Sequence, residues 1–327
     1  MKRRVFISSA AVAVAVSNPI IATAQQWPAR PLRLVVPFPA GGPTDSFARL
    51  YASALSVQLG QPVVVENKPG ASGALGAMDV RRSNPDGYSL LFGTATTHAL
   101  YNLIQPQAQY NALDDFAHVG VLGGAPVAFA VGMNMPRTLK TVIIAARMNP
   151  GKYNYGSPGN GTLLHIAAER LKQLVGAPIT HIPYKGAAPA MQDLIGGTIE
   201  MTVDTLGSLM PQHQAGRLRI LAVASAKRLA AAPDIPTVAE SADMDKPFEA
   251  MLWNAVSAPK ETPAAVLATL TEATRRVMQD PSVRSRLEVQ SMFANPHLGQ
   301  AAAATYIRAE QAKWKPIVAS LGNLTGN

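Results

Sequence analysis

The sequence contains no cysteine among its 327 residues, and only 15% of the residues are charged. Without cysteine the chain has no disulfide scaffold, no thiolate nucleophile and no cysteine-ligated zinc or iron–sulfur centre. A lipobox is excluded for the same reason, and with it an acyl anchor. Hydrophobic residues make up 48% of the chain, which favours a well-packed globular protein over a disordered one.

The motifs of several enzyme classes are also missing. The sequence has no phosphate-binding loop ending in Gly-Lys-Ser/Thr, no Gly-x-Ser-x-Gly nucleophile elbow and no His-Glu-x-x-His zinc motif. The six histidines are dispersed, and His165 with Glu169 is the one pair whose spacing suggests a metal site. Two ligands without a third do not make a catalytic zinc site, so an ordinary polar pair is favoured. We expect no cofactor and no metal.

The excess of basic residues is mild. The formal net charge is +9, and it falls by three to +6 without residues 1–24, which hold three basic and no acidic side chains. The basic residues are scattered and few aromatic residues lie between them, so a nucleic-acid partner is not indicated. A positive field that attracts anionic ligands is the simpler interpretation.

The N-terminus is typical of an export signal. Three basic residues at positions 2–4 precede an apolar stretch at 5–21, and Ala22-Thr23-Ala24 forms a small-x-small cleavage site. Arg3-Arg4 leaves the twin-arginine and general secretory routes both open. The apolar stretch is interrupted and too short for a membrane span, and no later stretch could cross a bilayer. We predict a signal peptide at 1–24, a periplasmic mature chain and no stable membrane insertion.

The length favours two lobes, because a single core stops growing at roughly 250–300 residues. Short apolar strands alternate with amphipathic helices, which predicts an α/β fold with a largely parallel sheet and helices on both faces. Apolar residues at 116–132 mark a crossing into the second lobe, and a strand at 218–224 with the proline-rich stretch 233–240 is expected to carry the chain back towards the first lobe. We assign 25–125 and 248–327 to the first lobe and 126–247 to the second.

The stretch at 34–45 predicts a strand, a glycine loop and the start of a helix. Gly41 and Gly42 allow a ligand to approach the main chain, and the first amides of a helix suit a carboxylate or phosphate. We predict backbone donors at Ala40, Gly41 and Gly42 and an apolar wall at Phe38. For Asp45, ligand contact and a simple charge interaction with the helix dipole are about equally favoured.

Similar openings follow later strands, and ligands of such sheets bind at the carboxyl ends of the strands. Thr162 is a natural N-cap, and His165 either donates a hydrogen bond to an anion or makes a capping contact with Thr162. Asp204 ends a strand and is predicted to hold a water or an amine. Lys185 supplies a counter-charge or is simply solvated. The remaining candidates for ligand binding are hydroxyl and amide side chains in two loops: Thr94, Thr97, Ser157 and Asn160.

These features together resemble the Bug family of periplasmic solute-binding proteins, the receptors of tripartite tricarboxylate transporters. The similarity covers essentially the whole mature chain. The matching segments occur in the family's order: 37–45 (PFPAGGPTD), 65–73 (VENKPGASG), 84–88 (NPDGY), 155–162 (YGSPGNGT) with His165, 183–186 (PYKG), 216–219 (GRLR), and Arg228 with 233–240 (PDIPTVAE). Ser241-Ala242 departs from the family's usual Ala-Gly, away from the expected cleft.

The resemblance implies a two-lobed periplasmic-binding-protein fold, type II-like, with two crossover segments and a ligand cleft between the lobes. It further implies a carboxylate held by the first glycine loop, the loops at 94–97 and 157–162 and the Asp204 region, partly through waters. Members differ widely in ligand, so the acid is not identified.

We therefore expect a non-enzymatic, monomeric receptor that delivers a small organic acid or amino acid to membrane transporter subunits. A sensor protein is the alternative partner. A hydrolase or isomerase that uses His165 and Asp204 as acid and base is the rival from another class.

Overall fold

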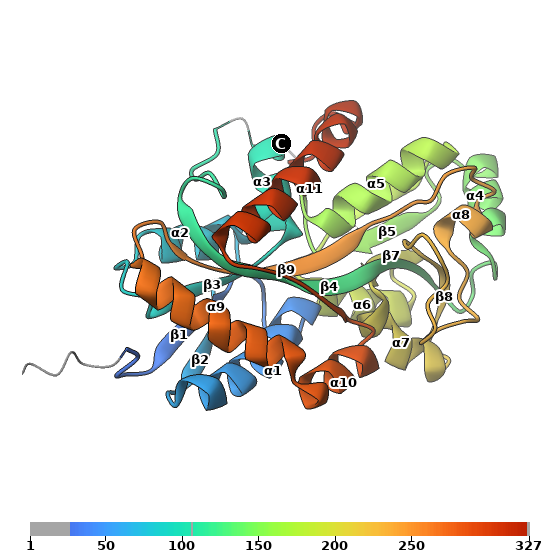
Figure 1. Cartoon of the computed structure of the whole chain (residues 1–327). Coiled ribbons are helices and arrows are strands. Elements are labelled where there is room, and N and C mark those ends of the chain that lie inside the picture. Colours follow the sequence, from blue (N-terminus) through green and yellow to red (C-terminus); the bar gives the residue numbers. More distant parts are fainter. Residues whose placement is uncertain (1–26, 106, 326–327) are drawn as a thin grey trace, which may run out of the picture.

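The computed structural model describes residues 27–105 and 107–325, so the predicted signal peptide lies outside the described residues. Two α/β halves share one sheet with the strand order β2-β1-β3-β9-β4-β7-β5-β6, and β8 and β10 both pair with β4. Helices cover both faces of this sheet (Figure 1). Within these ranges no helix is long and apolar enough to cross a membrane.

The first half is built around β1, which pairs in parallel with β2 and β3. Pro43 occupies the first turn of α1, where its missing N–H costs nothing, and Gly60 ends that helix in the left-handed conformation. The elements of this half are β1 (Leu32–Val36), α1 (Pro43–Leu59), β2 (Val63–Asn67), η1 (Ala71–Gly73), α2 (Ala74–Arg81), β3 (Ser89–Thr94), η2 (Thr96–Leu100), α3 (Tyr101–Ile104), α9 (Ala264–Gln279), α10 (Pro281–Val289), β10 (Phe293–Leu298) and α11 (Gln300–Leu321).

The second half repeats the same strand-loop-helix unit, with β5 in parallel between β6 and β7. Its helices end on glycine where the chain must turn, as at Gly176 after α5 and Gly197 after α6. The elements are α4 (Leu139–Met148), β5 (Asn154–Ser157), α5 (Leu163–Val175), β6 (Thr180–Pro183), α6 (Ala187–Gly196), β7 (Met201–Thr205), α7 (Leu206–Gln214), β8 (Leu218–Val223) and α8 (Val238–Ser241).

Two strands connect the halves and run side by side along the middle of the molecule (Figure 1). The first, β4 (Phe116–Gly132), pairs with β9 (Met251–Pro259) up to Pro126 and with β7 and β8 beyond it. A side chain at Gly124 would collide with the backbone of Leu252 and Trp253, so glycine permits this close pairing. The predicted lobe boundary at 125/126 falls inside β4, and the division into lobes stays a proposal.

The structure corrects the prediction of a largely parallel sheet. The sheet is parallel within each half but antiparallel in the middle, because β4 and β9 cross in opposite directions. The chain returns to the first half through β9, which begins shortly after the predicted boundary at 247/248, and the stretch 233–240 before it contains the short helix α8. The sequence does not predict β9, since its run of apolar residues is short and lies between prolines.

A buried polar cluster lies where β3, β4 and β9 meet. The Ser257 hydroxyl is 3.0 Å from His98 Nε2 and 2.8 Å from His118 Nδ1, and all three side chains are at most 1% exposed. Burial lowers the pKa of His98 to about 3 and that of His118 to about 4. Both imidazoles are therefore neutral in the folded protein at pH 7.

Replacement of Tyr51 by Phe tests the packing of α1 against α9. The Tyr51 hydroxyl lies 2.6 Å from Thr274 Oγ1, and both residues are fully buried. Tyr51→Phe leaves the Thr274 hydroxyl unsatisfied, so we expect urea unfolding to show a loss of about 1–2 kcal/mol. The double variant Tyr51→Phe/Thr274→Val removes both polar groups and is expected to lose less. A double variant less stable than the single one would contradict this contact.

Mild acid is expected to lower the free energy of unfolding. Unfolded histidine takes up a proton near pH 6.5, whereas His98 and His118 stay neutral in the fold until the pH falls to their lowered pKa values. Each histidine contributes stability that is present above about pH 6.5 and is lost progressively toward pH 4. The free energy of unfolding falls by about 1–2 kcal/mol per histidine between pH 7 and 5. His165 and His181 act in the same direction, and Asp204, with its raised pKa, acts against them.

Urea unfolding at pH 7.5, 6.5 and 5.5 measures this dependence before most carboxylates titrate. A free energy of unfolding that is constant or rises toward pH 5.5 would show that the histidines are not buried in neutral form.

Candidate ligand-binding site

A cavity of about 60 Å³ lies between the two halves, at the carboxyl ends of β1, β5 and β6. Loops and helix starts from both halves form its wall. The lining residues of the first half are Phe38, Pro39, Ala40, Gly42, Pro43, Thr44, Thr96 and Leu252, and those of the second half are Pro158, Thr162, Leu163, Leu164, Lys185, Gly186, Ala187, Ala188 and Pro189.

Three helices begin at this cavity. The first turns of α1, α5 and α6 all contribute to its lining. The amides of Thr44, Leu164, Ala187 and Ala188 have no hydrogen-bond acceptor among the described residues. Because a helix N-terminus carries a partial positive charge and free N–H groups, this arrangement suits an anion.

The side chains of the lining also carry a positive charge. Within the described ranges, Lys185 is the one charged residue of the cavity wall. It stands in the loop between β6 and α6 and is exposed. The absence of a carboxylate from this wall means that an entering anion meets no repulsion there.

The first glycine loop is held in place by Asp45. Its carboxylate accepts hydrogen bonds from Gly41 N and Arg49 Nε at 2.9 Å and from Asn67 Nδ2, also at 2.9 Å. Burial alone would raise the pKa of Asp45, but these hydrogen bonds together lower it, so the carboxylate is charged. Asp45 does not line the cavity, and the Gly41 amide is already occupied. The structure thus places Asp45 behind the ligand-facing surface, while Gly41 lines only an adjoining pocket.

The threonines after β3 differ from the predicted open loop. Thr94 ends β3 and Thr97 lies in the helical turn η2, and their hydroxyls make hydrogen bonds within residues 94–98. The neighbouring Thr96 lines the cavity instead, and its Oγ1 accepts a hydrogen bond from Leu163 N at 3.0 Å. Thr96 thereby joins the two halves at the first amide of α5.

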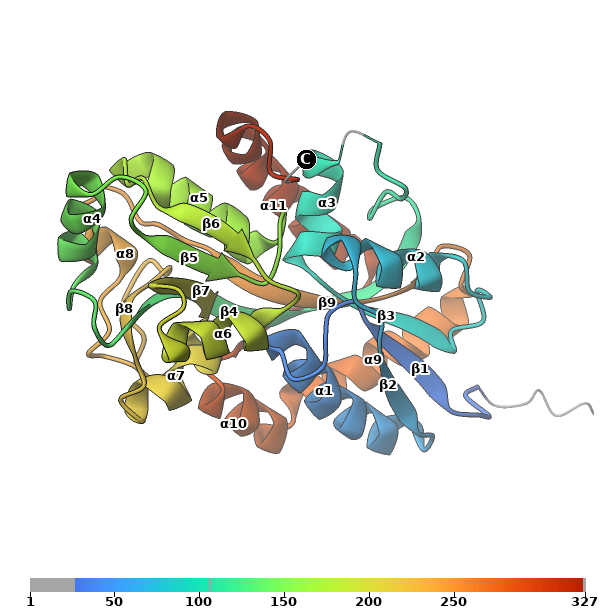
Figure 2. The same cartoon turned by 180° about the vertical axis from the view of Figure 1, so that it is seen from behind.

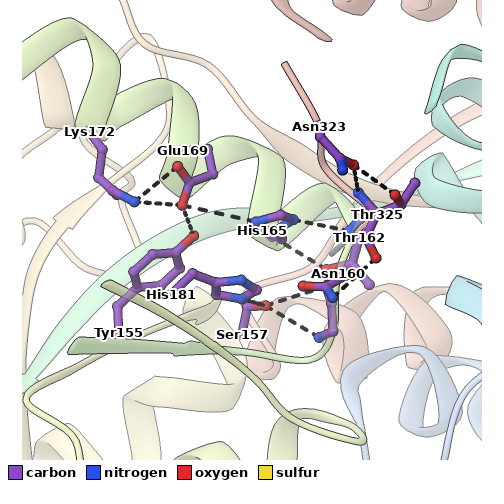
Figure 3. Close-up of polar contacts among 12 residues, drawn as sticks. Tyr155, Ser157, Asn160, Thr162, His165, Glu169, Lys172, His181, Asn323 and Thr325 are labelled. Carbon is purple, nitrogen blue, oxygen red and sulfur yellow. Dashed lines mark hydrogen bonds and ion pairs between the residues drawn. The ribbon is translucent and has the colours of Figure 1, made fainter. Parts of the chain in front are cut away.

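Polar side chains stabilise the loop between β5 and α5 through hydrogen bonds (Figure 3). Thr162 caps α5, accepting from His165 N, and its hydroxyl donates to Gly159 O at 2.8 Å. The predicted capping contact between Thr162 and His165 is therefore present. Ser157 is fully buried and its Oγ lies 2.7 Å from His181 Nε2, so Ser157 does not line the cavity.

Two larger pockets adjoin the cavity. One of about 590 Å³ contains Asn160, Ser72 and Lys185. There the Ser72 hydroxyl donates to Asn160 O at 2.6 Å, a second contact between the halves. The other, of about 530 Å³, shares Gly42, Pro43, Ala187 and Ala188 with the cavity and includes Gly41 and Asp204.

Asp204 is the one carboxylate in the lining of the second adjoining pocket, as far as the structure describes it. It is 3% exposed and accepts a hydrogen bond from Thr205 N at 2.7 Å. Burial raises its pKa to about 7. At neutral pH this carboxyl can therefore either accept or donate a hydrogen bond.

The predicted residues fall into three groups. Phe38, Ala40, Gly42 and Thr162 line the cavity, while Gly41, Asp204 and Asn160 line the adjoining pockets. Asp45, Thr94, Thr97, Ser157 and His165 lie outside all three linings.

Sequence reasoning missed part of the wall. Thr44, Thr96, Leu252 and the start of α6 were not predicted as site residues. For α6 a signal existed, because 183–188 repeats the pattern of strand, glycine and helix start seen at 36–44.

Comparisons with known proteins place this chain in a family of receptors. A family model described as the tripartite tricarboxylate transporter family receptor matches residues 47–323. A protein of Agrobacterium vitis from the TAR-I ttuE-ttuC′ intergenic region is 38% identical over 82% of this chain and 77% of its own length. Protein BugT of Bordetella pertussis is 32% identical over 97% of this chain and 95% of its own.

Solved structures share the fold. Rpa4515 of R. palustris, determined with adipate, has a TM-score of 0.86 and 33% identity over 90% of this chain and 98% of its own. The periplasmic binding protein BugD has a TM-score of 0.86 and 31% identity over 91% and 99%. MatC of Rhodopseudomonas palustris, with bound malate, has a TM-score of 0.83 and 29% identity over 89% and 100%.

These matches confirm the predicted periplasmic-binding-protein fold and the expectation of a receptor rather than an enzyme. The chain belongs to the tripartite tricarboxylate transporter receptor family, which includes the Bug proteins.

Proposed function

We propose that the mature chain is a periplasmic receptor that encloses a small carboxylate between its lobes and delivers it to the membrane subunits of a tripartite tricarboxylate-type transporter. The observation that carries this proposal is the meeting of three helix N-termini at a cavity whose wall contains Lys185 and, among the described residues, no acidic side chain.

The energetics of this site suit a carboxylate. A hydrogen bond to a charged group contributes about 1.5–3 kcal/mol, and micromolar affinity requires roughly 8 kcal/mol. Three or four amides donating to one carboxylate, together with the apolar contact of Phe38 and Leu252, reach that range. A cavity of about 60 Å³ holds the acid group and a short stem, and the adjoining pockets hold the remainder of the ligand.

The residues have distinct roles in this proposal. Ala40, Gly42 and the start of α6 present backbone to the acid group, and Thr162 shapes the start of α5. Asp204 holds a water or a polar group of the ligand from the adjoining pocket of about 530 Å³. Asp45, Thr94, Thr97 and Ser157 hold the loops and do not touch the ligand. Adipate and malate, present in the structures of two relatives, support a short organic acid.

The remaining parts of the proposal concern location and assembly. Residues 1–24 direct export by the twin-arginine or the general secretory route, and the mature chain acts as a monomer. Its partners are the membrane subunits.

Replacement of Ala187 by Pro removes one ligand-facing amide without disturbing α6. Ala187 is the first residue of that helix, a position that proline favours. After a thermal-shift screen of mono- and dicarboxylates identifies a ligand, we expect calorimetry to show affinity weakened about 10- to 100-fold by Ala187→Pro.

Ala264→Pro is the matched control, since Ala264 is the first residue of α9 and does not line the cavity or either adjoining pocket. It is expected to leave the affinity unchanged. Equal affinities of wild type and Ala187→Pro, or a screen in which no carboxylate raises the melting temperature, would refute the proposed site.

Replacement of Lys185 by Gln removes the cation of the cavity wall. Because Lys185 is exposed, we expect an affinity only about two- to fivefold weaker at low salt, and a smaller difference at high salt. Lys227→Gln changes an exposed lysine elsewhere and is expected to have no such effect. Identical salt dependence in wild type and Lys185→Gln would remove Lys185 from the site.

A further inference from the structure

We propose that His165 and His181 are positioning residues: as a stacked, neutral pair they hold the loop 157–162 and, through it, the start of α5 at the cavity. This inference rests on the proposed function for its purpose, but its test requires no ligand.

Each histidine holds one point of the loop (Figure 3). His165 Nδ1 accepts a hydrogen bond from Gly161 N at 3.0 Å, and His181 Nε2 lies 2.7 Å from Ser157 Oγ. Ser157 Oγ in turn accepts from Gly159 N at 3.3 Å. The two contacts therefore fix the beginning and the end of this glycine-rich loop.

The loop needs such support because its glycines adopt unusual conformations. Gly159 has φ +141° and Gly161 has φ +67°, values that glycine adopts freely. Glycine also gives the chain the largest conformational freedom, so that the sequence around 159–161 does not by itself specify one shape. Side chains outside the loop have to select it.

The two imidazoles support one another. Their ring centroids lie 4.0 Å apart with an interplanar angle of 18°, and Tyr155 stacks on His181 at 4.8 Å. Such a stack tolerates two neutral rings, whereas two imidazolium cations at this distance would repel. The pair is thus held rigidly only while it is uncharged.

The hydrogen bond from Gly161 defines the protonation state of His165. Since Gly161 N donates, Nδ1 must carry a lone pair, and the proton of the neutral ring is on Nε2, which lies 4.0 Å from Glu169 Oε1. Glu169 also accepts from the Tyr155 hydroxyl and from Lys172 Nζ, both at the same oxygen.

The surroundings of the pair keep it neutral. Glu169 and Lys172 of α5 and Tyr155 of β5 are the ionisable groups that face it within the described residues. Burial lowers the pKa of His165 to about 4, although Glu169 opposes this shift. Burial also lowers the pKa of His181 to about 3, and the neighbouring His165 ring and the Lys172 cation act in the same direction.

Nitrogen NMR of the imidazoles and amide hydrogen exchange test the proposal on the full chain. At pH 7 we expect His165 to show an unprotonated Nδ1 and a protonated Nε2. In His165→Phe, which preserves a ring for stacking but has no acceptor, the Gly161 amide is expected to exchange about tenfold faster. His165→Asn, which restores an acceptor near the position of Nδ1, should bring the rate back close to wild type.

The same design applies to His181. His181→Phe is expected to accelerate exchange at Gly159, and His181→Gln to restore it. His213→Phe is the matched control. His213 lies in α7, outside the loop, and its Nδ1 likewise accepts a hydrogen bond from a backbone amide, that of Ile220, at 3.3 Å. It should leave Gly159 and Gly161 unchanged.

Two results would overturn the proposal: a protonated Nδ1 on His165 at pH 7, or unchanged Gly161 exchange in a folded His165→Phe variant. If that variant does not fold, the NMR measurement on the wild type decides alone. Failure of carboxylates to bind would refute the proposed function but would leave this result standing.

Discussion

A helix leaves its first amides without intrahelical acceptors, and in this protein three such ends meet at one small cavity between two lobes. Enclosing a free amide away from water costs about 1–3 kcal/mol. The protein satisfies one of them itself, since Thr96 of the first half accepts from the first amide of α5. The others have no acceptor among the described residues and are available to a ligand.

The rest of the architecture places these ends against one another. Strands β4 and β9 cross between the halves and pair with each other over Phe116–Pro126 of β4, so these two strands join the halves (Figure 2). Behind the cavity, separate polar networks hold each loop: Asp45 with Asn67 on one side, and Ser157 with the paired histidines on the other.

The sequence predicts the strand-loop-helix units well, because glycine, proline and N-cap residues at 36–45 and 157–162 have strong local preferences. It predicts less well which side chains reach the ligand. Asp45 and Thr97 were predicted to contact the ligand because of their positions after strands. Their side-chain oxygens instead make hydrogen bonds with neighbouring residues, Gly41 and His98. Thr96 and Leu252 become part of the wall only through the pairing of distant elements, and that pairing depends on β9, whose short apolar run carries no local signal.

The central claim is that backbone amides at helix starts hold the acid group of the ligand. A crystal structure with a carboxylate identified by the thermal-shift screen tests it most directly. The account predicts that the carboxylate oxygens lie within hydrogen-bond distance of amides in the first turns of α1 and α6, with Lys185 at the edge. A carboxylate bound elsewhere, for example in the groove formed by Arg170, Asp243–Glu249 and Lys313, with the three helix starts unoccupied, would contradict it.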